Sequence, residues 1–235
     1  MDLEAILFDV DDTLFDRIGA QRATLDLLTA EFADLFAGLD QETLLEAFLE
    51  SDRLTVHAFN AQESCESTRT RRSRLFLEML GLGSETVGPM TSFYVREYPH
   101  VGRPVPGARV VLEALAGRFR LGVVSDGLPD VQYRKLETLG VRHLFEVIVL
   151  SGELNIWKPD ARIFAQAVGA LGCSPAACLY VGDSYERDVV GARNAGLRAC
   201  WFNPGRLEPP GEVRPDFEIY ALGELLENLT NDRRS

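Results

Sequence analysis

The stretch that decides the fold of this chain is Ile6-Leu7-Phe8-Asp9-Val10-Asp11-Asp12-Thr13-Leu14. It begins with an apolar run of the kind found in buried strands and ends in three carboxylates and a threonine. Open α/β folds bind ligands at the carboxyl ends of their strands, so these carboxylates are expected at the active edge of a sheet. Carboxylates this close together repel one another. We therefore expect a cation or phosphate chemistry to compensate them.

Other apolar runs of the same kind follow along the chain. The strand-like segments, which are short and rich in Val, Ile and Leu, are 5–8, 121–124, 147–150, 179–181 and 199–202. Continuously apolar strands are buried on both faces, as in a parallel sheet. Helical patterns lie between the later segments, at 108–116, 131–139, 161–171 and 189–194. This alternation predicts an α/β fold with a doubly wound, Rossmann-like parallel sheet.

One long segment interrupts the alternation. From residue 16 to about residue 101 we find no strand pattern, whereas Leu and Phe recur at helical spacing within 25–36, 44–49 and 75–80. The return runs through a turn-rich linker of Pro99, Gly102, Pro104, Pro106 and Gly107. We therefore predict an α/β core domain of residues 1–15 and 103–235 and an inserted α-helical cap domain of residues 16–102. The polar tail after about residue 228 is expected to fray.

Composition excludes several classes of partner. The chain has 235 residues and a formal charge of −12, from 24 Lys and Arg against 36 Asp and Glu, so it should repel nucleic acids and anionic membranes. We find neither a signal-peptide pattern nor an apolar run near the ~18 residues of a membrane span, and we expect a cytoplasmic protein. Its 4 cysteines and 3 histidines do not form a zinc pattern, so free thiols are expected. The sequence does not indicate an oligomeric state.

Three more predicted strand ends carry polar groups. Ser125 precedes a turn of Asp126 and Gly127, Lys158 lies just before a predicted helix, and Asp183 follows Gly182. Taken alone, each of these residues can also be explained without a function. Ser-Asp-Gly is a common turn, and a lysine near a helix start is usually solvated. Together they place a hydroxyl, a cation and a carboxylate on the same sheet edge as Asp9.

This ordered set resembles the motifs of the haloacid dehalogenase superfamily. The matching residues are Asp9-x-Asp11-x-Thr13, then Ser125, then Lys158, then Gly182-Asp183 with Asp188 five residues later. The helical insert directly after the first motif is similar to that of the subclass with a C1 cap. For Asp188 the residue pattern leaves two roles open, one in the site and one as the N-cap of a helix.

The resemblance implies a phosphatase that works in two steps. Asp9 would attack phosphorus and form an aspartyl-phosphate, while Asp11 would protonate the leaving oxygen and then activate water. Mg²⁺ would bind the Asp9 carboxylate, the Asp11 carbonyl and Asp183, and Lys158 would reduce repulsion between Asp9 and its anionic substrate.

The remaining motif residues would bind phosphate or support the site. Ser125 and the amides of Asp126 and Gly127 would hold phosphate oxygens. Thr13 would brace the first turn or orient Asp9 by hydrogen bonding, and Asp188 would sit behind the metal or Lys158. Relatives often carry Gly where Asn155 stands, and Asn tolerates the left-handed backbone that this turn requires.

The substrate is expected to be a small phosphorylated metabolite, because nucleotidase-like and phosphoglycolate-phosphatase-like relatives are resembled about equally. Arg17 follows the first motif and is the best single candidate for a second substrate contact. A basic cluster is formed by Arg69, Arg71, Arg72 and Arg74. It could bind a second anionic group of the substrate, or it could be only a solvated helix face. Three other functions stay open on the same fold: a haloacid dehalogenase, which needs neither the metal nor Asp11, a phosphomutase, and a catalytically silent binding protein.

Overall fold

The computed structural model describes residues 3–57 and 65–232, and it contains a six-stranded parallel sheet. The strands are β1 (Ala5–Phe8), β2 (Arg120–Ser125), β3 (Val147–Leu150), β4 (Cys178–Gly182), β5 (Arg198–Phe202) and β6 (Phe217–Ile219). Their order is β3-β2-β1-β4-β5-β6, so the chain builds outward from β1 first to one side and then to the other. The strand order therefore reverses beside β1, which is where such sheets bind ligands.

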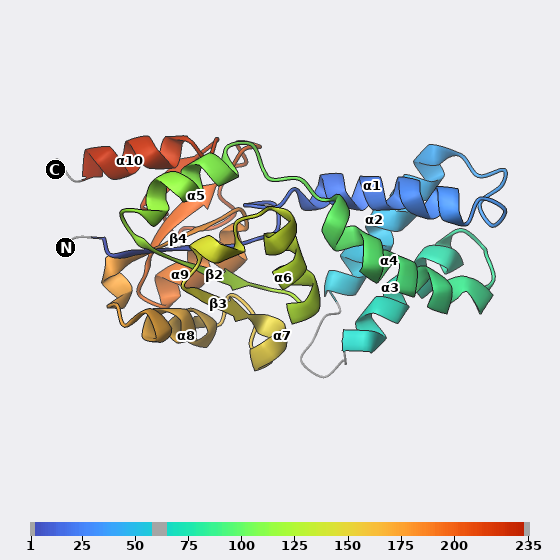
Figure 1. Ribbon diagram of the computed structural model, residues 1–235, viewed down its shortest axis with the longest axis horizontal. Coiled ribbons are helices and arrows are strands. Elements are labelled where there is room, and N and C mark those ends of the chain that lie inside the picture. Colours follow the sequence, from blue (N-terminus) through green and yellow to red (C-terminus); the bar gives the residue numbers. More distant parts are fainter. Residues whose placement is uncertain (1–2, 58–64, 233–235) are drawn as a thin grey trace. The chain divides into compact units, whose positions relative to one another are not determined.

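Helices cover both faces of this sheet (Figure 1). They are α5 (Ala108–Ala116), α6 (Pro129–Thr138), α7 (Ser151–Leu154), α8 (Ala161–Leu171), the π-helical turn η4 (Tyr185–Val190), α9 (Gly191–Asn194) and α10 (Glu224–Asp232), with short 3₁₀ turns η2 (Arg142–Leu144) and η3 (Pro175–Ala177). Figure 1 shows α5 and α10 on one side of the strands and α8 on the other. Ala5 and Leu7 pack in one core with Phe164 of α8, so the alternate residues Ile6 and Phe8 face the opposite layer. The predicted doubly wound α/β fold is confirmed.

Two features at the end of the chain differ from the sequence prediction. The strand β6 was not predicted, because it has three residues and only two of them are apolar. The fraying expected after residue 228 is wrong for residues 229–232, because α10 continues to Asp232, and residues 233–235 lie outside the described part of the chain. Leu225 and Leu229 of α10, and Leu222 just before it, are all buried, so they fix this helix to the core.

The chain divides into two compact units, of which the second is Arg17–Gly102 and the first comprises Met1–Asp16 and Arg103–Ser235. The described part of the second unit is helical: α1 (Arg17–Glu31), α2 (Gln41–His57), α3 (Cys65–Met79), the 3₁₀ turn η1 (Ser84–Thr86) and α4 (Val87–Val101). Assigning Pro99 to the returning linker was wrong. It lies in the last turn of α4, where its missing N–H removes only one terminal hydrogen bond.

Aromatic side chains form the centre of the second unit. Phe76 of α3 contacts Phe36 and Phe48, with ring centroids 5.8 and 5.3 Å away, and Phe48 contacts Tyr94 of α4. Tyr94 also stacks on Tyr98. Each of these rings is mostly buried, so the helices of this unit share a core of their own.

No helix among residues 3–57 and 65–232 has the length and apolar character needed to cross a membrane.

Close packing at Gly122 gives a stability prediction. A Cβ atom at this position in β2 would lie 2.6 Å from Leu7 Cδ2 of β1 and 2.6 Å from Val147 Cγ1 of β3. Gly122→Ala should therefore lower the free energy of unfolding by about 1–3 kcal/mol, as overpacking does. Urea denaturation measures this change. The control Gly117→Ala meets nothing within 4 Å and should change stability far less, and an equal effect of both would contradict the packing argument.

Candidate active site

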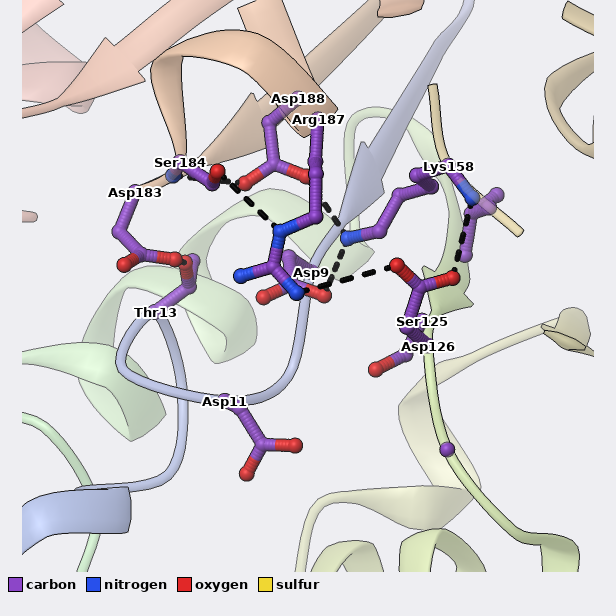
Figure 2. A network of polar contacts seen from close by, with 12 residues as sticks. Asp9, Asp11, Thr13, Ser125, Asp126, Lys158, Asp183, Ser184, Arg187 and Asp188 are labelled. Atoms are coloured by element: carbon purple, nitrogen blue, oxygen red, sulfur yellow. Dashed lines mark hydrogen bonds and ion pairs between the residues drawn. The ribbon is translucent and has the colours of Figure 1, made fainter. Parts of the chain in front are cut away.

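Four predicted residues meet at the carboxyl edge of the sheet, around the centre of Figure 2. Asp9 directly follows β1, Ser125 ends β2, and Asp183 directly follows the neighbouring strand β4. Lys158 reaches the same place from the segment before α8. Residues far apart in sequence are brought together here because β1 lies between β2 and β4.

Lys158 is the centre of a buried polar network. Its ammonium donates hydrogen bonds to Asp9 Oδ1 at 2.6 Å, to Asp188 Oδ1 at 2.7 Å and to the Tyr180 hydroxyl at 3.0 Å. Its side chain is only 2% exposed, which excludes the alternative of a solvated lysine. Burial alone lowers the pKa of Lys158, but Asp188 and Asp9 outweigh burial and raise this pKa well above its usual value. The lysine is therefore a permanent cation against Asp9.

Asp188 holds Lys158 from behind. It lies inside η4 and not at the start of a helix, so the alternative prediction that Asp188 is a helix N-cap is wrong. Its second carboxylate oxygen accepts a hydrogen bond from the Ser184 amide at 2.8 Å. A Cβ atom on Gly182 would lie 2.4 Å from the Asp188 carboxyl carbon, which explains the glycine at the end of β4. Both oxygens of Asp188 are thus used to fix the site.

Asp9, Asp183 and Asp188 form a cluster whose ligand oxygens lie within 4.8 Å of one another. Burial, with added repulsion from Asp188 and Asp9, raises the pKa of Asp183 to about 8. Burial also raises the pKa of Asp9 to about 6, although Lys158 opposes this change. The ionised form of Asp183 therefore lacks a counter-charge, because Lys158 is already paired with Asp9 and Asp188. The all-oxygen donor set fits one small divalent cation, for which Asp9 and Asp183 are the candidate side-chain ligands.

Thr13 lies beside the cluster. Its hydroxyl is 3.5 Å from Asp183 Oδ1, a long contact, and the residue is fully buried. The backbone before it turns through Asp12, which adopts a positive φ of 56°. Asn155, at the end of α7, also adopts a left-handed backbone, with φ 54°, as its residue type allows.

The turn after β2 places the expected phosphate-binding groups. The Ser125 side chain is buried and its oxygen accepts a hydrogen bond from Gln132 at 3.0 Å. The Gly127 amide donates to Ser151 Oγ at 3.0 Å, so a phosphate would have to replace Ser151 as its acceptor. Asp126 Oδ1 accepts from the Lys158 amide at 3.1 Å, which gives its carboxylate a local partner.

Four residues that reach this region were not identified from the sequence. Tyr180 binds Lys158 and donates to the Val124 carbonyl at 2.7 Å, and Arg187 lies 3.9 Å from Asp126 Oδ2. Gln132 and Lys135 of α6 both contact the Asp11 carboxylate. Their i, i+3 spacing puts the last two on one helix face, which is the signal that could have identified them.

The predicted substrate arginines belong to the second unit. Arg17 and Arg72 both pair with Asp52, Arg72 at 3.4 Å, and the Arg72 guanidinium lies 3.4 Å from the centre of the Tyr94 ring. Arg71 and Arg74 are exposed and Arg69 is half-buried, as on a partly solvated helix face. The cluster therefore separates into an inward Arg72 and outward Arg71 and Arg74.

A model of the haloacid dehalogenase-like hydrolases matches residues 6–202, which is more than half of the chain. The chain belongs to this family. Pyrimidine 5'-nucleotidase YjjG of Escherichia coli is 29% identical over 95% of this chain and 96% of its own. Glyceraldehyde 3-phosphate phosphatase of Methanopyrus kandleri is 30% identical over 96% of each chain. The superfamily resemblance is thereby confirmed, and the chain is a hydrolase of this family.

A solved structure supports the same conclusion for this haloacid dehalogenase-like hydrolase. The putative hydrolase YfnB from Bacillus subtilis, described as bound to magnesium, superposes with a TM-score of 0.81 and 27% identity. The match covers 98% of this chain and all of the YfnB chain.

The acidic cluster predicts how the stability of the metal-free protein changes with pH. Asp9 and Asp183 have pKa values raised from 3.8 to about 6 and about 8, so between about pH 4 and 8 the folded state binds more protons than the unfolded state. Stability in chelator should therefore fall as pH rises through this window. Asp183→Asn should raise the free energy of unfolding at pH 8 by about 1 kcal/mol or more.

Urea denaturation at several pH values with and without Mg²⁺ tests this expectation. Mg²⁺ should stabilise the wild type more than the Asp183→Asn variant, because the cation neutralises the Asp183 carboxylate and the variant lacks this carboxylate. Glu208→Gln is the control, because this exposed carboxylate lies outside the cluster and should leave the pH profile unchanged. A wild-type stability that rises from pH 5 to 8 in chelator would contradict the charge argument.

Proposed function

We propose that this protein is a Mg²⁺-dependent phosphatase that hydrolyses a small phosphomonoester through an aspartyl-phosphate on Asp9. The observation that carries the proposal is the contact between Lys158 and Asp9 Oδ1 at the end of β1. It fixes one carboxylate oxygen beside a buried cation, at the sheet edge where Ser125 ends β2 and Asp183 directly follows β4. A nucleophile for an anionic substrate needs this neutralisation.

In the first step, Asp9 attacks the phosphorus atom of the substrate. Because Lys158 holds Oδ1, we assign the attack to Oδ2. A bond forms between this oxygen and phosphorus, and the bond between phosphorus and the ester oxygen breaks. Asp11 donates its proton to the departing oxygen, which leaves as an alcohol.

In the second step, Asp11 accepts a proton from water, whose oxygen attacks phosphorus. The bond from phosphorus to Asp9 breaks, which regenerates the carboxylate and releases inorganic phosphate. The Ser125 hydroxyl donates a hydrogen bond to a phosphate oxygen in both steps. Lys158 stabilises the negative charge that returns to the Asp9 carboxylate. One carboxyl group thus serves as acid and then as base.

The metal ion belongs at the acidic cluster. Asp9 and Asp183 would hold Mg²⁺ with the Asp11 carbonyl, while Asp188 remains bound to Lys158 and the Ser184 amide. When bound, Mg²⁺ neutralises charge on the transferring phosphoryl group. The magnesium described for YfnB supports this assignment.

The substrate class follows from the relatives and from charge. YjjG and the Methanopyrus enzyme are named for small phosphorylated compounds, a pyrimidine nucleotide and glyceraldehyde 3-phosphate. A formal charge of −12 disfavours polyanions such as nucleic acids. We propose a nucleoside monophosphate or a small sugar or organic-acid phosphate as the substrate, with the unit Arg17–Gly102 acting as the cap that selects it. Free thiols at Cys173, Cys178 and Cys200 suit a reducing cytoplasm.

The first test of the function is hydrolysis of p-nitrophenyl phosphate. The protein should release phosphate with Mg²⁺ and lose this activity in excess chelator, because Asp183 then lacks its counter-charge. Asp9→Asn should abolish turnover and covalent phosphoenzyme, and Asp11→Asn should lower kcat by about 10²–10⁴-fold. The control Glu208→Gln should keep wild-type activity. Near wild-type turnover by Asp9→Asn, or chloride release from 2-chloropropionate instead of phosphate release, would overturn the proposal.

The second test concerns the arginines proposed to select the substrate. Once a screen of phosphorylated metabolites has found the best substrate, Arg17→Ala should lower its kcat/KM about tenfold more than that of p-nitrophenyl phosphate. Asp52 keeps Arg72 as a partner in this variant, so the unit should stay folded. Arg71→Ala is measured beside it, and the exposed Arg53→Ala is the control. Equal losses on both substrates, or none, would reject Arg17 and Arg71 as specificity residues.

A further inference from the structure

Helix α6 carries two buried polar side chains to Asp11. Gln132 is 1% exposed and the Lys135 side chain is 4% exposed, and the two residues lie one turn apart on the same helix face. Lysine and glutamine are seldom buried like this unless they bind a specific partner. Helix packing alone does not explain why two polar side chains lie on the inner face of α6. A specific binding partner for them is needed.

Lys135 binds one oxygen of the Asp11 carboxylate. Its ammonium lies 2.6 Å from Asp11 Oδ1 and 4.9 Å from the centre of the Phe15 ring. Phe15 is fully buried, so it restricts the space around the ammonium. A charge-assisted bond in these surroundings is strong and directional. Lys135 thus fixes where Asp11 Oδ1 lies.

Gln132 binds the other oxygen and connects it to Ser125. Its Nε2 atom lies 2.9 Å from Asp11 Oδ2, 3.0 Å from Ser125 Oγ and 3.1 Å from the Asp126 carbonyl. Three surrounding acceptors assign the nitrogen, rather than the oxygen, to this end of the amide. Because Ser125 Oγ accepts here, its own hydrogen is available for another acceptor, such as a phosphate oxygen.

Gly127 provides the space for Gln132. A Cβ atom on Gly127 would lie 2.7 Å from Gln132 Nε2 and 2.8 Å from Gln132 Cγ. Any side chain at residue 127 would therefore push the glutamine away from its acceptors. The glycine of the Ser-Asp-Gly turn is explained by this close approach and not only by turn geometry.

We propose that Gln132 and Lys135 are positioning residues that hold the Asp11 carboxylate where it reaches the leaving oxygen. Figure 2 shows the Asp11 carboxylate directed away from that of Asp9. In an in-line displacement the attacking and leaving oxygens lie on opposite sides of phosphorus, so the acid must be held apart from the nucleophile. The inference rests on the proposed function, because it assigns Asp11 the role of acid and base.

The proposal predicts an effect that depends on the leaving group. An alkyl alcohol needs a proton from Asp11 to depart, whereas p-nitrophenolate is stable enough to leave without one. Lys135→Met should therefore lower kcat/KM about tenfold or more for an alkyl phosphate and only about threefold or less for p-nitrophenyl phosphate. Gln132→Leu should act in the same direction. Lys135→Arg, which keeps the charge, should recover part of the loss.

Two controls separate positioning from a structural role. Arg134→Met removes an exposed cation from the same helix and should leave both substrates unaffected. Lys135→Met made in an Asp11→Asn background should lower the residual turnover no further, because its partner is already disabled. Thermal unfolding of each variant shows whether it is folded. If Lys135→Met does not fold, Lys135→Arg and Gln132→Leu provide the test.

The outcomes distinguish this inference from the proposed function. Equal losses on both substrates, or a full further loss in the Asp11→Asn background, would overturn the positioning role while leaving the phosphatase intact. Wild-type activity of Asp11→Asn would instead overturn the acid and base role assigned under the proposed function. A selective loss on the alkyl phosphate, removed by Asp11→Asn and partly recovered by Lys135→Arg, is the expected result.

Discussion

The ion pairs of Lys158 are the interaction on which the rest of the site depends. Asp9 and Asp188 are both buried, and two buried carboxylates would repel each other without a cation between them. Lys158 reaches them through the segment before α8, where Asp160 caps the helix by accepting from the Arg162 amide. Tyr180 completes the group by binding the lysine and the Val124 carbonyl, so strands β2 and β4 are tied to it. Asp9, the proposed nucleophile, is therefore positioned by charge as well as by the sheet.

Sequence reasoning reached the fold and the strand-end residues because both follow from local patterns. Continuous apolar runs predict buried strands, and a polar residue where such a run stops predicts a position on one edge of a parallel sheet. The segments 147–150 and 161–171 match β3 and α8 for the same reason. A three-residue edge strand such as β6 leaves no comparable pattern.

The contacts of α6 follow from the sequence only in part. The i, i+3 spacing of Gln132 and Lys135 predicts that they share a helix face, but only the folded chain shows that this face turns toward Asp11. The arginines posed the opposite problem. Their number indicated a basic patch, but the partner of Arg17 and Arg72 is Asp52, a carboxylate far from both in sequence. Pairing between distant charges depends on tertiary packing that composition does not record.

The central place of β1 has a consequence for the order in which the protein assembles. Ala5 pairs with Arg120 on one side and Cys178 on the other, so β1, which precedes the other five strands of the sheet, cannot pair until its neighbours have been synthesised. The helical unit Arg17–Gly102 is complete before either neighbour exists. A nascent chain that stops short of residue 188 lacks the full lysine and carboxylate group. Until then the proposed nucleophile Asp9 lacks its complete counter-charge group, so a truncated product would carry Asp9 without the arrangement proposed to activate it.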